Sequence, residues 1–186
     1  KPLHSPTPLT FIRLGTSGAI QADIALDSLV VAKGAIGFDN LMHYYDPKMS
    51  DHPLAESLHA HMGNPKKINH PYYALGDESL LAACIDLGMQ QGIIATNAGF
   101  YAPQGRHLRT QKVVDSDNHH LSQFKYNNSV ITNFDMETAG IYGLSRVLGH
   151  KAISVSAILT NRINGTFSKN PDQAVHEMIA TVTSAI

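Results

Sequence analysis

The chain has 186 residues, of which 43% are hydrophobic, so it can bury one sizeable core, and its length fits a single domain over residues 1–186. Its formal net charge of −1 excludes partners recruited by bulk charge, and we expect neither a nucleic-acid nor a membrane partner. No apolar run approaches the length of a membrane span, and the first residues lack a signal-peptide pattern. The single cysteine, Cys84, cannot form an internal disulfide, which fits a reducing compartment. We expect a soluble, cytoplasmic protein.

The first half of the chain alternates short apolar runs with helical patterns. Leu9–Leu14 reads LTFIRL and predicts a buried strand. The Gly15–Gly18 segment that follows predicts a turn whose backbone N–H groups can approach an anion. Ser28–Ile36 predicts a second strand. Two helices are predicted after it, Pro53–Met62 and Asp77–Leu87, the latter opened by Asp77 as an N-cap and closed by Gly88.

The second half continues the alternation. Gly92–Ala98 predicts a strand, and Val130–Phe134 predicts a short strand before a helix that opens at Asp135 and closes at Gly149. Lys151–Leu159 reads KAISVSAIL and predicts a buried strand, and Pro171–Ile186 predicts an amphipathic closing helix. Strands that alternate with helices predict an α/β fold with a mixed, largely parallel central sheet.

Polar residues gather where the predicted strands end. In α/β folds, ligands bind at the carboxyl ends of the strands. Scattered surface residues would not share this placement, so it indicates a binding site. The four clusters are Arg13–Gly18, Phe100–Arg106, Asp135–Glu137 and Asn161–Arg162.

The segment FYAPQGR carries the most specific chemistry of the four clusters. Gln104 offers a donor and an acceptor from one planar amide, and Arg106 offers a rigid fork of donors. Together they match the edge of uracil, which presents two carbonyl oxygens on either side of an N–H group. Phe100 supplies an apolar face on which a flat ring can stack. Taken alone, the segment also fits a surface loop that follows a strand.

The eleven histidines do not predict a metal site. His59 and His61 form the densest group, with His52 and His70 nearby, and His119 and His120 form a second. Neither group has a recognised zinc spacing with supporting cysteine or carboxylate ligands. We expect surface or locally bonded histidines and no metal.

The four clusters in order resemble the nucleoside phosphorylase superfamily, and within it the uridine phosphorylase branch. FIRLGTSGAIQADIALDSLVVA is similar to the phosphate-loop segment of that family, and FYAPQGR is similar to its uracil-reading segment. NFDMETAG resembles the ribose-binding segment, with Asp135 where the family usually has Glu, and ILTNR resembles the strand end that finishes in Asn-Arg. The resemblance runs from about Leu9 to the closing helix and implies a three-layer α/β/α fold.

The resemblance also implies roles for individual residues. Arg13, Gln104 and Arg106 would carry catalysis. The implied contacts are phosphate with Arg13, Gly15 and Thr16; ribose with Thr16, Met136 and Glu137; and the base with Phe100, Gln104, Arg106 and Arg162. The implied enzyme is a pentosyltransferase that cleaves uridine, or a related pyrimidine nucleoside, to uracil and ribose 1-phosphate. Inorganic phosphate is its co-substrate, and it needs no cofactor.

Physical chemistry supports these roles. Phosphorolysis passes through an oxocarbenium-like sugar, as glycoside hydrolysis does, and negative charge develops on the departing base. Fixed donors at the uracil oxygens therefore stabilise the transition state more than the ground state. Purine-specific relatives commonly place an Asp after the strand equivalent to KAISVSAIL, where it protonates the purine. Here the strand ends in Thr160-Asn161-Arg162, none of which is a general acid at neutral pH, and this favours pyrimidines.

Several alternatives stay open. Arg13 also fits a structural ion pair, and Asp135 and Glu137 also fit residues that favour a helix N-terminus. Met136 also fits a core position. A purine phosphorylase or a nucleosidase of the same fold is the second hypothesis, although nucleosidases do not need the phosphate-binding Arg13. An inactive nucleoside-binding relative or fragment is the third.

The chain departs from the family at its beginning. Family members start with strands and a Gly-Asp-Pro type loop that contributes to the phosphate site, and nothing before Leu9 matches these elements. We therefore expect an N-terminally incomplete family member, whose remainder is absent, cleaved or outside this sequence. The family also shares its active site between subunits, which implies a dimer-based homo-oligomer, a hexamer by resemblance.

Overall fold

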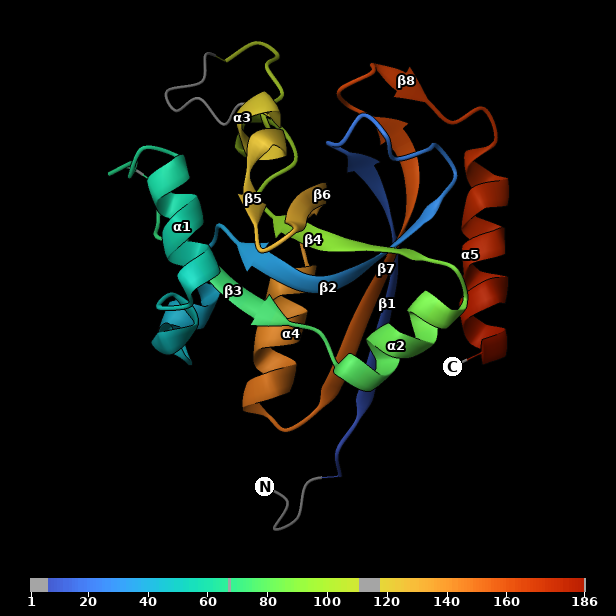
Figure 1. Cartoon of the computed structure of the whole chain (residues 1–186), viewed down its shortest axis with the longest axis horizontal. Helices are drawn as coiled ribbons and strands as arrows, with labels where there is room; N and C mark the ends of the chain where they lie inside the picture. Colours follow the sequence, from blue (N-terminus) through green and yellow to red (C-terminus); the bar gives the residue numbers. More distant parts are fainter. Residues whose placement is uncertain (1–6, 67, 111–117, 186) are drawn as a thin grey trace.

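The computed structural model describes residues 7–66, 68–110 and 118–185. Within them, eight strands form the centre of the fold and helices cover them (Figure 1). The strands are β1 (Thr10–Ala19), β2 (Leu29–Gly37), β3 (Tyr72–Leu75), β4 (Gln90–Thr96), β5 (Lys125–Tyr126), β6 (Ser129–Asp135), β7 (Lys151–Asn161) and β8 (Thr166–Phe167). The α-helices are α1 (Pro53–His61), α2 (Glu78–Asp86), α3 (Asn118–Gln123), α4 (Thr138–Val147) and α5 (Pro171–Ala185). Short 3-10 turns lie at Leu41–Tyr44, Pro47–Met49 and Ala102–Gln104.

The sheet is mixed and closes on itself. Its order is β3-β2-β4-β6-β1-β7-β8, and β2 also pairs with β7. Strands β2, β4, β6, β1 and β7 therefore form a closed ring, which the sequence did not predict. The three parallel pairings are β1 with β7, β2 with β4, and β4 with β6, and the first of them is the longest ladder in the sheet.

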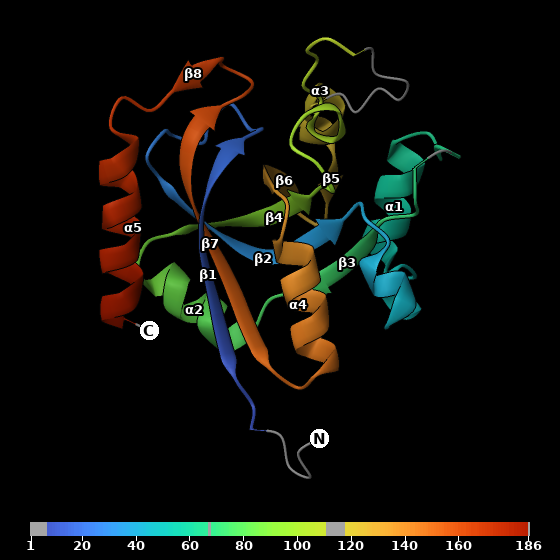
Figure 2. The same cartoon turned by 180° about the vertical axis from the view of Figure 1, so that it is seen from behind.

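Helices cover both faces of the sheet, because neighbouring strand residues point to opposite sides. On β4, Ile94 packs in the same core as Tyr142 of α4, whereas Ile93 packs with residues of α1 and α3. On β7, Ile153 and Val155 pack with α2 and α5. Helices α1 and α5 lie on opposite flanks of the sheet (Figure 1), and α4 crosses in front of it in the reverse view (Figure 2). The α/β class and the layered arrangement predicted from the sequence are confirmed.

Most of the predicted elements are confirmed within a few residues, but the predicted turn over Gly15–Gly18 is wrong. Strand β1 runs unbroken from Thr10 to Ala19 and pairs with β7 along its length, with a register shift between Ser17 and Gly18. The first polar cluster therefore lies within a strand. Small residues are needed there for side-chain packing, because a Cβ at Gly18 would meet Thr160 and Arg162.

Three further features of the described residues concern membrane spans, metal-ligand clusters and cysteine. No helix among them has the length and apolar character required for a membrane crossing. Within the same ranges, no group of three or more His, Cys, Asp or Glu side chains is placed to hold a metal ion. Cys84 is free and buried.

Candidate active site

Arg13 on β1 lies between two carboxylates from the β6–α4 junction. Its Nη1 lies 3.7 Å from Asp135 Oδ2, and its Nη2 forms an ion pair with Glu137 Oε2. The guanidinium folds back over Gly15, where an added Cβ would lie 2.8 Å from Arg13 Cζ. Because Gly15 has no side chain, the Arg13 guanidinium can occupy the space above it. Arg13, predicted to bind phosphate, and Glu137, predicted to bind ribose, are in direct contact.

Asp135, at the end of β6, is the buried centre of this group. Its Oδ1 accepts a hydrogen bond from Thr96 Oγ1 at 2.6 Å, and its Oδ2 accepts from the Thr138 backbone N–H at 3.1 Å and from the Thr138 hydroxyl. Burial raises the pKa of Asp135, and hydrogen bonds from Thr138 and Thr96 and the Arg13 charge offset this only in part. Thr138 is the first residue of α4, so the carboxylate also satisfies a backbone donor at the helix start.

Gln104 and Arg106 form a connected pair beyond the end of β4. Gln104 is 4% exposed, and its Nε2 donates to the Asp135 carbonyl oxygen at 3.4 Å. Arg106 Nη1 donates to Gln104 Oε1 at 2.7 Å and to the Phe100 carbonyl oxygen. The Arg106 Cζ lies 3.6 Å from the centroid of the Phe100 ring. Phe100 therefore stacks against Arg106, and a base that stacks on the same face would have to displace that guanidinium.

Arg162 follows β7, and its Cζ lies 4.9 Å from the centroid of the Phe134 ring on β6. Burial, and then the charge of Arg106, lower the pKa of Arg162 to about 10, so it carries a positive charge at neutral pH. Thr16 and Met136 are exposed beside this group. The Met136 backbone N–H donates to Glu137 Oε2 at 3.3 Å, whereas among the described residues the side chains of Thr16 and Met136 make no hydrogen bond to the other predicted site residues.

Asp135 connects the two halves of the predicted site. Its carboxylate is near Arg13, and its carbonyl oxygen accepts from Gln104. Sequence reasoning gave Asp135 no site role and missed two residues that support it, Thr96 on β4 and Ser154 on β7. Ser154 Oγ accepts from Arg13 Nη1 at 3.4 Å and lies 2.9 Å from the Thr138 hydroxyl oxygen, whose single proton goes to Asp135. The available signal was a small polar residue within an otherwise apolar strand, as in GIIATN and KAISVSAIL.

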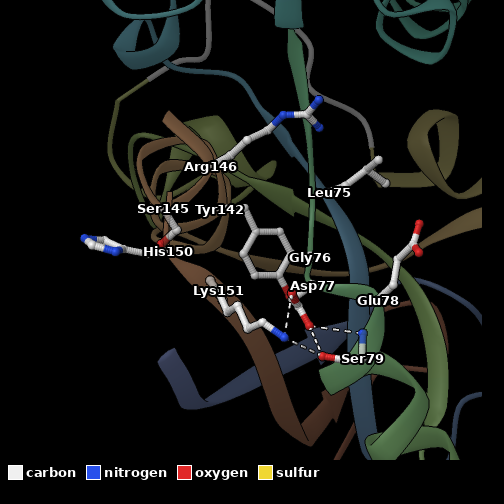
Figure 3. A pocket seen from close by; sticks show the side chains of 11 residues that line it. Leu75, Gly76, Asp77, Glu78, Ser79, Tyr142, Ser145, Arg146, His150 and Lys151 are labelled. Atoms are coloured by element: carbon white, nitrogen blue, oxygen red, sulfur yellow. Dashed lines mark hydrogen bonds and ion pairs between the residues drawn. The ribbon is translucent and has the colours of Figure 1, made fainter. Parts of the chain in front are cut away.

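A separate cleft of about 590 Å³ lies at the amino end of β7. In Figure 3, Lys151 reaches toward Asp77 and Ser79 at the start of α2, while Arg146 extends from α4 on another side of the cleft. Lys151 Nζ lies 3.6 Å from Asp77 Oδ2 and donates to Ser79 Oγ at 2.9 Å. None of the predicted site residues lines this cleft.

Comparison with known proteins gives a consistent family. The model of a family described as the phosphorylase superfamily matches residues 3–186. A uridine phosphorylase of Thermococcus kodakarensis is 29% identical over 168 residues, which are 86% of this chain and 51% of that protein. A DeoD-type purine nucleoside phosphorylase of Buchnera aphidicola is 24% identical over 177 residues, covering 94% of this chain and 63% of the relative.

A solved structure agrees with these relatives. A Trypanosoma brucei nucleoside phosphorylase, whose structure is described as showing uridine phosphorylase activity, superposes with a TM-score of 0.79 at 25% identity. The match covers 95% of this chain and 62% of that one. The chain therefore spans between about half and two thirds of the length of the proteins it matches.

Proposed function

The chain belongs to the phosphorylase superfamily, and we propose that it carries the nucleoside-binding and phosphate-binding residues of a pentosyltransferase that cleaves uridine. The products are uracil and ribose 1-phosphate. The observation that carries the proposal is the placement of Asp135, which contacts Arg13 through its carboxylate and Gln104 through its carbonyl oxygen. Residues that suit phosphate and ribose are thereby joined to residues that suit a uracil edge.

In the proposed reaction, a phosphate oxygen attacks C1′ of the ribose as the bond from C1′ to uracil N1 breaks. The electron pair of that bond leaves with the base, which takes up a proton from solvent. Arg13 holds the phosphate, and Glu137 accepts hydrogen bonds from the ribose hydroxyls. Both roles require the Arg13–Glu137 ion pair to open when the substrates bind. Because Glu137 is half exposed, that opening costs little.

Gln104 and Arg106 stabilise the departing base. Their mutual hydrogen bond at 2.7 Å orients the amide and the guanidinium relative to each other before the substrate binds. Donors that are already oriented stabilise the charge that develops on uracil without further rearrangement. The nearby positive charge of Arg162 acts in the same direction.

Purine cleavage is the second candidate, because DeoD-type purine nucleoside phosphorylases are among the relatives. The residues after β7 argue against it. Asn161 is buried and holds backbone groups through both its amide nitrogen and its oxygen, and Arg162 is a cation, so neither donates a proton to a departing purine. One uridine phosphorylase is 29% identical to the chain, whereas the purine relatives named above are 24% and 26% identical.

The test measures uracil release from uridine with and without phosphate, together with the intact mass of the purified protein. Uracil that forms only with phosphate supports the proposal, and inosine tested in parallel separates the purine candidate. Failure both to cleave and to bind any pyrimidine nucleoside would sink it. Stabilisation by uracil without turnover would instead indicate a nucleoside-binding protein that lacks activity.

Two further expectations belong to the same proposal. The chain forms a single domain of a protein that acts as a dimer-based homo-oligomer, a hexamer by resemblance, and the protein is cytoplasmic. The matched regions make up 51% and 63% of two of the relatives. Intact mass and sedimentation velocity test the length and the assembly.

A further inference from the structure

Two buried polar donors at the site edge of the sheet have no hydrogen-bond partner. Among the described residues, the buried side-chain nitrogen and oxygen atoms without a partner are His59 Nδ1, Asn97 Nδ2 and Arg162 Nη1. Asn97 follows β4 directly and Arg162 follows β7 directly, so two of the three lie at carboxyl ends of strands. Buried polar groups are nearly always hydrogen-bonded, and an exception needs an explanation.

The backbone fixes the direction of the Asn97 side chain. Its N–H donates to the Asp135 carbonyl oxygen at 3.0 Å, so the β4–β6 ladder continues past the pairing of Thr96 with Asp135. Side chains alternate along a strand, and the Thr96 hydroxyl reaches the Asp135 carboxylate on the face covered by α4. Asn97 therefore lies on the opposite face, the one that carries Ala95 and its cross-strand partner Phe134.

The base-reading residues converge on this same face. The ring of Phe134 lies against the Arg162 guanidinium. Gln104 Nε2 and the backbone N–H of Asn97 both donate to the Asp135 carbonyl oxygen. Gln104 and Arg106 bond to each other, whereas the Asn97 side chain makes no hydrogen bond within the described residues although it is only 4% exposed. An unused amide thus lies beside the residues assigned to the base.

We propose that Asn97 is a further base-contacting residue whose Nδ2 donates a hydrogen bond to a carbonyl oxygen of an oxo-pyrimidine. The inference rests on the proposed function and deepens it, since it adds a donor that neither the sequence motifs nor the family match assigns. Its ligand class is a base with carbonyl acceptors on this edge, such as uracil or thymine. A site that holds a donor for such an oxygen discriminates against bases that lack the oxygen, because the buried amide then stays unpaired.

The test compares Asn97→Ala with Asn161→Ala. Asn161 is the matched control because it is an equally buried asparagine, but its Nδ2 donates to the Gln21 and Ile24 carbonyls at 2.8 and 2.9 Å and its Oδ1 accepts from two backbone N–H groups. We expect Asn97→Ala to lower the unfolding temperature of the free protein much less than Asn161→Ala does. In the same protein, the thermal shift caused by uracil should disappear, and kcat/KM for uridine should fall about 10- to 100-fold.

The outcomes are separable. If wild type shows a uracil-dependent thermal shift and Asn97→Ala keeps it, the inference is overturned and the proposed function stands. If Asn97→Ala destabilises the free protein as much as Asn161→Ala, the amide is structural and the inference also fails. If wild type neither binds uracil nor cleaves uridine, the proposed function fails and the inference falls with it. Asn97→Ser restores a small donor, so it should recover part of the uracil binding that Asn97→Ala loses, and no recovery would contradict the donor role.

Discussion

At the scale of single residues, the charged groups of the site depend on small neighbours. Arg13 can meet Asp135 and Glu137 because Gly15 has no side chain under the guanidinium. The hydroxyls of Thr96 and Thr138 donate to the buried Asp135 carboxyl group and offset part of the cost of burying it, although its pKa remains raised. The charged residues of the candidate site therefore depend on neighbours that carry no charge: Gly15 leaves room for Arg13, and two threonine hydroxyls bond to Asp135.

Gly15→Ala should weaken phosphate use while leaving the fold nearly unchanged. The added Cβ displaces the end of the Arg13 side chain, which is flexible and can move toward solvent at little cost in stability. A displaced guanidinium no longer holds phosphate in line with C1′, so we expect the KM for phosphate to rise about 10- to 100-fold. Steady-state kinetics with phosphate as the varied substrate measure this.

Gly88→Ala is the matched control for that change. Gly88 ends α2 with a φ of +81° and has open space around its Cα, so alanine strains the backbone without touching the site. We expect it to lower the free energy of unfolding by about 1 kcal/mol with no change in the KM for phosphate. An unchanged phosphate KM in Gly15→Ala would contradict the role assigned to Arg13.

At the scale of elements, hydrophobic patterns and helix caps predicted most of the strands and helices. Local composition gave a wrong prediction where side-chain packing determined which small residues a strand contains. The Gly15–Gly18 run has the composition of a turn, yet its small residues make room for Arg13 and Arg162 along a continuous strand. The short strands β3, β5 and β8 were not predicted, because two to four residues carry too little pattern to recognise. The candidate site residues were predicted from sequence motifs. The connection through Asp135 and the position of Asn97 could be recognised only from the register of β4 and β6.

Helix α2 offers a test of a cap that the sequence predicted correctly. Asp77 Oδ1 accepts from the Ser79 and Leu80 backbone N–H groups, and Oδ2 lies 3.6 Å from Lys151 Nζ. Burial raises the pKa of Asp77, but hydrogen bonds from Ser79 and Leu80 and the Lys151 charge outweigh it, so the pKa lies below its usual value. We expect Asp77→Ala to lower the free energy of unfolding by about 1 kcal/mol at pH 7.

The sign of the pH dependence follows from the lowered pKa. The stability that ionised Asp77 contributes is present above its unfolded-state pKa of 3.8 and is lost as the pH falls through the lower folded-state value. The difference between wild type and Asp77→Ala in urea unfolding should therefore shrink below that pH. Asp86→Ala, at the last residue of the same helix, is the control and should cost nothing, because a carboxylate is unfavourable at a helix C-terminus. A difference for Asp77→Ala that does not change with pH would contradict the role of its charge.

At the scale of the whole molecule, closure of the strand ring depends on a seam between β2 and β7. Their antiparallel ladder pairs Leu29–Val31 with Val155–Ala157, and the next pair in register would be Ala32 with Ser154. At that position the Tyr142 hydroxyl bridges the two strands in place of a backbone hydrogen bond between them. It donates to the Ala32 carbonyl oxygen at 2.7 Å and accepts from the Ser154 N–H at 2.8 Å. Helix α4 is thus bonded to both strands where they separate.

Tyr142→Phe should lower the stability of the whole fold, because it leaves two buried backbone groups without a partner. Burial raises the pKa of Tyr142, so the hydroxyl keeps its proton and donates at all ordinary pH values. We expect the free energy of unfolding to fall by about 1 to 3 kcal/mol in a single cooperative transition, measured by urea denaturation. Ser154 also accepts from Arg13, so the loss at the seam should reach the site and raise the KM for phosphate modestly.

Tyr73→Phe is the control for that measurement. Tyr73 on β3 is buried as well, but among the described residues its hydroxyl has no hydrogen bond, so its removal should change the free energy of unfolding by less than about 0.5 kcal/mol. Equal losses from the two tyrosines would mean that the hydrogen bonds of the Tyr142 hydroxyl add no stability at the seam. A larger loss for Tyr142→Phe alone would show that one side chain of α4 stabilises the closed ring of strands. The first residue of the same helix bonds to Asp135 in the candidate site.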